Sequence, residues 1–114
     1  MALFDQSARI RQLQERIEAD GFDELAHFQL GEEYGRLGRW REAFAKFRRV
    51  IELNPESLEA YLAMGDACEK AGVPKEADAA WRTGETVALR LTRPEYTSIF
   101  AERRARLSPE AYLN

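Results

Sequence analysis

The sequence predicts an all-α protein, and two observations carry that prediction. Along most of the 114 residues, apolar side chains recur at steps of three and four, which is the period of a helix. Runs of alternating Val, Ile and Thr, the usual sign of strands, do not occur. The breaks between the apolar runs are short, so consecutive helices should pack as antiparallel neighbours.

Six helices are expected in this chain. They cover residues 7–19, 24–37, 40–53, 58–71, 74–91 and 94–107. Two of the breaks, at 20–23 and 54–57, combine turn-forming residues with a side chain that suits a helix N-cap.

Glycine, proline and threonine mark the other helix boundaries. Gly38 and Gly72 stand where two helices should stop, as expected for C-caps with a left-handed backbone. Pro74 suits the first turn of the fifth helix, where its missing N–H has no intrahelical partner. Thr92 with Glu95 three residues later is expected to form a capping box that opens the last helix.

Composition and charge exclude several classes of protein. The chain has 17 basic and 20 acidic residues, a net charge of −3, which is too mild to predict binding to nucleic acid or an anionic membrane. The single cysteine, Cys68, forms neither an internal disulfide nor a multi-cysteine zinc site. The sequence shows no apolar run long enough to span a bilayer and no basic or apolar leader at its start. We therefore expect a cytoplasmic protein.

A period of 34 residues is the most informative signal. Shifting the chain by that amount places Leu30-Gly31 on Met64-Gly65, Gly38 on Gly72, Glu42-Ala43 on Glu76-Ala77, and Phe47 on Trp81. Such a match indicates a repeated helix–turn–helix unit.

The two units carry a recognisable pattern. The first, 24–57, has Leu30-Gly31-x-x-Tyr34, then Ala43-x-x-x-Phe47 and Pro55; the second, 58–91, has Tyr61-x-x-Met64-Gly65 and Ala77-x-x-x-Trp81. The sequence resembles the tetratricopeptide-repeat family. The departures from the family pattern are His27, Cys68, Gly84 and Leu89, where Trp, Tyr, Ala and Pro are usual.

The resemblance implies a right-handed α-solenoid of antiparallel helix pairs in one domain, 1–114. An N-terminal half-repeat helix would cover 7–23, and a capping helix with a tail would cover 92–114. The last helix places Tyr96, Ile99, Phe100 and Leu107 on one side, and its charged residues, Glu102, Arg103, Arg104 and Arg106, mostly elsewhere.

Small residues predict close helix contacts inside each unit. Gly31 and Gly65 let the first helix approach its partner where a Cβ would clash, and Ala43 and Ala77 are expected opposite them. Large aromatic side chains should fill the wider gaps around these contacts.

Catalytic and nucleic-acid sites find little support in the sequence. His27, the only histidine, and Cys68 both occupy core-facing positions of the repeat pattern, and no metalloprotease, phosphate-loop or serine-hydrolase motif occurs. We expect neither an enzyme nor a cofactor. The basic stretches at 46–49 and 103–106 are interpreted as solvated helix faces.

In the family, the first helices of successive units line a concave groove that binds peptides or partner proteins. The resemblance therefore assigns a candidate binding stripe: Leu25, Phe28, Gln29, Glu32 and Arg36 in the first unit, and Glu59, Leu62, Ala63, Asp66 and Lys70 in the second. Some relatives use this face to hold the C-terminal carboxylate of chaperone tails, but the matching places here are Phe28, Glu32 and Ala63, which disfavours such a ligand.

Two functions follow from this stripe and stay open. The first is a non-catalytic interaction module that binds a peptide or protein with apolar anchors and basic residues. The second is a self-associating subunit, for example a homodimer, with no free groove. Three elements are candidates to cover part of the stripe: Leu3 and Phe4, the last helix, or a second copy of the chain.

Overall fold

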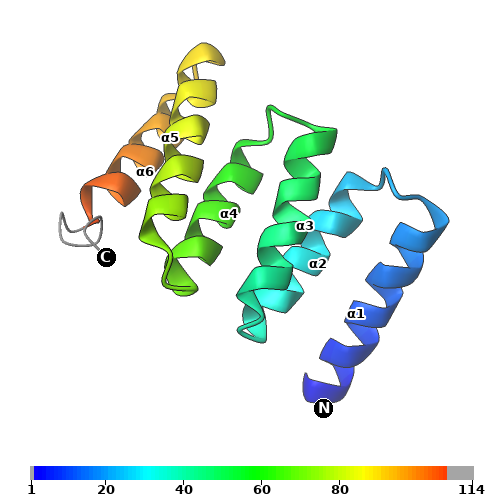
Figure 1. Ribbon diagram of the computed structural model, residues 1–114. Coiled ribbons are helices and arrows are strands. Elements are labelled where there is room, and N and C mark those ends of the chain that lie inside the picture. Colours follow the sequence, from blue (N-terminus) through cyan, green and yellow to red (C-terminus); the bar gives the residue numbers. More distant parts are fainter. Residues whose placement is uncertain (1, 108–114) are drawn as a thin grey trace.

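Figure 1 shows the computed structural model, which describes the backbone of residues 2–107 and the side chains of residues 6–107. The described chain forms six helices and no strand: α1 (Ala2–Ala19), α2 (Glu24–Arg36), α3 (Trp40–Leu53), α4 (Leu58–Lys70), α5 (Pro74–Arg90) and α6 (Pro94–Ala105). The prediction of an all-α solenoid is confirmed. Only α1 departs clearly from the expected bounds, since it begins at Ala2 rather than at residue 7.

The helices stack in the order of the sequence. Each packs chiefly against the helix before it and the helix after it. In Figure 1, α2 lies behind α3 and α6 behind α5. The smallest extent of the chain is 22 Å, which is the thickness of two helices with their side chains.

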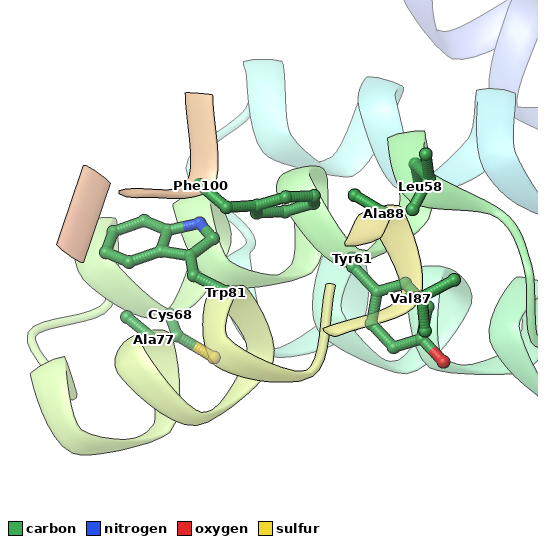
Figure 2. Packing of buried hydrophobic residues seen from close by; sticks show 8 residues of the cluster. All are labelled: Leu58, Tyr61, Cys68, Ala77, Trp81, Val87, Ala88 and Phe100. Carbon is green, nitrogen blue, oxygen red and sulfur yellow. The ribbon is translucent and has the colours of Figure 1, made fainter. Parts of the chain in front are cut away.

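The core consists of two clusters, and each extends beyond a single helix pair. The first comprises Leu13, Ala26, Leu30, Tyr34, Ala43, Phe47 and Ala67. The second comprises Leu58, Tyr61, Cys68, Ala77, Trp81, Val87, Ala88 and Phe100 (Figure 2). Leu13 comes from α1 and Phe100 from α6, so the flanking helices complete the cores that the two pairs leave open.

Aromatic rings lie against the helix glycines. A Cβ on Gly31 would stand 2.6 Å from Phe47 Cε1, and a Cβ on Gly65 would overlap the Trp81 indole. The atoms nearest such a Cβ belong to Phe47 and Trp81 rather than to Ala43 and Ala77. Both alanines are buried, but the aromatic ring four residues later fills the space beside the glycine.

The helix caps follow the predicted chemistry at four ends. Asp23 and Ser57 are N-caps whose side chains accept from Ala26 N–H at 3.0 Å and Ala60 N–H at 3.4 Å. Gly38 and Gly72 have φ values of 73° and 80°, as expected for left-handed C-caps.

The end of α5 differs from the prediction. Thr92 adopts the left-handed backbone, φ 55°, in the place that glycine holds after α2 and α4. The hydrogen bonds match those turns, since Arg93 N–H donates to Ala88 O at 2.9 Å as Val73 N–H does to Cys68 O at 3.0 Å. The N-cap of α6 is Arg93, so the expected capping box from Thr92 to Glu95 does not form.

Thr92→Gly is expected to stabilise the protein by about 1 kcal/mol, because a β-branched residue is strained in the left-handed region and glycine is not. The measurement is the free energy of unfolding in urea. Thr92→Ala, which removes the branch but keeps Cβ, should give a smaller gain. A lower stability for Thr92→Gly would contradict the argument from backbone strain.

Candidate protein-interaction surface

The stripe residues on α2 differ in how freely they face solvent. Leu25 is 56% exposed, whereas the Phe28 ring is half-buried against Phe47, with ring centroids 5.4 Å apart. Glu32 is exposed. The other two are engaged within the chain: Gln29 Oε1 accepts from Arg16 at 3.4 Å, and Arg36 donates to Glu33 at 2.7 Å.

The stripe residues on α4 are partly built into the fold. Leu62 packs against the second core cluster and Ala63 against the first. The Asp66 carboxylate accepts two hydrogen bonds from the Arg103 guanidinium of α6, at 3.0 and 3.3 Å. Glu59 and Lys70 are exposed.

Three of the ten stripe residues gather around one hollow. This hollow of about 250 Å³ lies where α2, α3 and α4 meet, and it is lined by Glu24, Leu25, Phe28, Val50, Ser57 and Glu59. Leu25, Phe28 and Val50 provide its apolar surface, while two carboxylates stand among the polar residues. The other seven stripe residues do not line it.

A second, more polar hollow of about 280 Å³ shares Glu24, Ser57 and Glu59 with the first. Arg93 and Tyr96, at the start of α6, also line it. Burial raises the pKa of the Tyr96 phenol, and the negative charge of Glu59 raises it further. The two hollows therefore form one acidic surface that reaches from α2 across α4 to α6.

Most residues that line the two hollows lie outside the repeat stripe, among them Glu24, Val50, Arg93 and Tyr96. Glu24 precedes the stripe, Val50 belongs to α3, and Arg93 and Tyr96 belong to α6. The stripe was assigned only to the first helix of each 34-residue unit. It therefore leaves out Val50, which lies near the end of the second helix of the first unit, α3. It also omits α6, because α5 is longer than α3 and shifts the following helix out of register.

The interpretation of 103–106 as a solvated face is wrong for two arginines. Arg103 binds Asp66, and Arg104 Nε donates to Asp78 of α5 at 2.9 Å. The Asp78 side chain is only 5% exposed and also accepts from Arg82 at 2.5 Å. These pairs fix α6 to both α4 and α5, because a buried carboxylate needs its cationic partners.

His27 and Cys68 lie in the core, where the repeat pattern places them. His27 is buried, and its Nε2 stands 3.0 Å from the Gly21 carbonyl oxygen. The carbonyl oxygen accepts a hydrogen bond in the tautomer that carries the proton on Nε2. This contact ties the α1–α2 turn to α2. Burial raises the pKa of the Cys68 thiol to about 11, so the residue is a neutral thiol at physiological pH.

Among the side chains of residues 6–107, no three of His, Cys, Asp or Glu are grouped so that they could hold a metal ion. No helix in the same part of the chain has the length and apolar character needed to cross a membrane.

One of the helix pairs matches a known protein family. The tetratricopeptide-repeat family model matches residues 24–57, the segment that holds α2 and α3. Residues 24–57 form a tetratricopeptide repeat. The pair α4–α5 repeats the geometry of the matched unit, since Gly65 lies under Trp81 as Gly31 lies under Phe47.

Solved structures show the same fold. Two crystal structures of MamA superimpose with a TM-score of 0.75 and 23% sequence identity over 81% of this chain. The superposition covers 50% of one MamA chain and 54% of the other, so this chain spans about half the length of those structures. No curated protein matches the sequence.

Proposed function

We propose that this protein is a non-catalytic interaction module that binds a peptide or a segment of a partner protein. The ligand lies on the face formed by α2, α4 and α6, and it carries apolar anchors beside one or more lysines or arginines. The proposed binding residues are the ten of the stripe, together with Glu24, Val50 and Tyr96 around the two hollows.

The hollow at the α2–α3–α4 junction carries this proposal. An aliphatic or aromatic side chain that enters it would contact Leu25, Phe28 and Val50 and lose its water there. Leu25 is already exposed in the free chain, so a ligand that covers it removes apolar surface from water. The apolar anchors therefore provide most of the affinity.

Charge selects among ligands with such anchors. Glu32 and Glu59 are exposed, whereas the Asp66 carboxylate already holds Arg103. We expect a basic side chain of the ligand to pair with Glu59 at the rim of the hollow, or with Glu32 one helical turn beyond Phe28. Exposed pairs contribute only about 0.2–1 kcal/mol each, so they favour basic over acidic ligands without dominating affinity.

Reversing both exposed acids tests this proposal. Short labelled peptides in which apolar residues alternate with lysine should bind the wild-type chain. Peptides with glutamate in place of each lysine should not bind. Glu32→Lys/Glu59→Lys is expected to weaken the lysine peptide about tenfold, measured by fluorescence anisotropy, because two attractions become repulsions. Added salt should reduce the difference between the two proteins.

A matched control separates a local effect from one of net charge. Glu15→Lys/Glu18→Lys changes the total charge equally, but both residues lie on α1, outside the stripe. This control should retain wild-type affinity. Equal weakening by both double variants, or none by either, would remove the α2–α4–α6 face as the binding surface.

Self-association is the second candidate function. It is favoured if the chain sediments as a stable oligomer in which the stripe is covered and the lysine peptide finds no site. Neither function requires catalysis or a cofactor. We place the module in the cytoplasm, with which its one free, buried cysteine is compatible.

A further inference from the structure

Two consecutive arginines of α6 pair with carboxylates in very different surroundings. Arg104 binds Asp78, whose side chain is only 5% exposed. Arg103 binds Asp66, whose side chain is 38% exposed, and 28% of the Arg103 side chain also reaches solvent. Breaking the buried pair would leave a carboxylate without water, whereas a pair as open as the second contributes little to stability. The open pair is therefore the one whose charge a ligand on the stripe can meet.

This open pair shows how a basic side chain binds to the stripe. Nε and Nη2 of Arg103 donate to the two carboxylate oxygens of Asp66, at 3.0 and 3.3 Å. Such a two-pronged contact is the strong form of an arginine–carboxylate pair. The hydrogen bonds to Asp66 raise the pKa of the Arg103 guanidinium, and the negative charges of Glu69 and Glu102 raise it further. One cation of the chain thus lies among three carboxylates.

Asp66 lies within reach of a ligand that binds the other acids of the stripe. The residue 34 positions earlier is Glu32, which is exposed. Asp66 also follows Glu59 by seven residues, so the two share one face of α4, about 10 Å apart along the helix axis. Lysines two residues apart in an extended peptide are separated by about 7 Å, and their long side chains cover the difference. A peptide that pairs with Glu59 can therefore place a second cation at Asp66.

We propose that Arg103 is an internal competitor for the basic side chains of the ligand. It holds Asp66 in the free chain, so a ligand cation that approaches this part of α4 finds the carboxylate occupied and meets a positive charge. The cations of the ligand are thereby confined to Glu32 and Glu59. This inference rests on the proposed function, because it concerns how the same face selects its ligand by charge.

Three variants separate the charge of the pair from its place in the fold. The pair is neutral in the wild type, negative in Arg103→Gln, positive in Asp66→Asn and neutral again in the double variant. By fluorescence anisotropy, the lysine peptide should bind Arg103→Gln about three- to tenfold more tightly than wild type, and Asp66→Asn about threefold more weakly. The double variant should return to about the wild-type affinity.

Two controls identify an effect that comes from loosening of α6. Arg106→Gln removes the same charge from the exposed end of α6 and should leave the affinity nearly unchanged. The glutamate peptide should not bind Arg103→Gln more tightly than wild type, because the gain comes from a freed carboxylate. Thermal melts should show that α6 stays in place, since Phe100 and the Arg104–Asp78 pair remain.

The outcomes distinguish this proposal from the function on which it rests. If the wild type binds the lysine peptide and Arg103→Gln binds it no more tightly, the interaction function stands and the proposal for Arg103 is wrong. A double variant that binds as tightly as Arg103→Gln, or an equal gain for the glutamate peptide, would also overturn the proposal. If neither the wild type nor Arg103→Gln binds the lysine peptide, both are wrong.

Discussion

Gly65→Ala is expected to lower the free energy of unfolding by about 2 kcal/mol or more, although alanine is the better helix former. A Cβ at this position would overlap Nε1 and Cδ1 of Trp81, whose side chain is fully buried. The indole lies beside the Phe100 ring, with Cys68 and Ala77 below it (Figure 2). The ring has no free space to enter, so the added methyl group must push α4 and α5 apart.

Gly35→Ala is the matched control in the sister helix α2. A Cβ there would stand 3.3 Å from Cζ3 of Trp40, a half-buried ring that borders an open hollow between α3 and α5. This ring can move by a few tenths of an ångström, so the gain in helix propensity, about 0.5–1 kcal/mol, should remain. Urea unfolding of both variants is the measurement. Equal stability of the two would show that close approach of α4 and α5 does not depend on Gly65.

Repetition explains why so much of the fold is predictable. Each helix pair contacts mainly its chain neighbours, so a local 34-residue pattern carries nearly all the information needed to assign α2–α5. Gly38 and Gly72 mark helix ends because only glycine enters the left-handed region at no steric cost. Thr92 carries no such signal. Its left-handed turn becomes visible only in three dimensions, and the helix that follows begins later than the period predicts.

The candidate site was less predictable because it depends on contacts between units. Helical period places Leu25 and Phe28 on one face, but only packing shows that Val50 of α3 completes the hollow with them. The pairing of charged residues is harder to predict than the apolar contacts. Asp66 and Arg103 are far apart in sequence, and no pattern in either helix indicates that they pair. The pairing occupies an acid that the sequence would offer to a ligand, which leaves Glu32 and Glu59 as the exposed acids of the stripe.

Phe100→Ala is expected to lower the free energy of unfolding by about 3–5 kcal/mol, the usual cost of removing a fully buried phenylalanine. The ring is inaccessible to solvent and fills the space that Gly84 leaves, since a Cβ on Gly84 would overlap it. It is also the one residue of α6 among the buried members of the second core cluster. Without it, α6 is held to the array chiefly by half-buried Tyr96, Ile99 and Leu107 and by its arginine pairs.

Leu89→Ala is the control for this variant, because Leu89 is 63% exposed and should change stability by little. The unfolding midpoint of each protein in urea measures the effect. Loss of the Phe100 ring should also loosen α6 selectively, so amide hydrogens of α6 should exchange faster than those of α2. A Phe100→Ala variant as stable as wild type would mean that α6 is an appended tail. The second helix pair would then close its core without α6, and the acidic surface that reaches Tyr96 would end at α4.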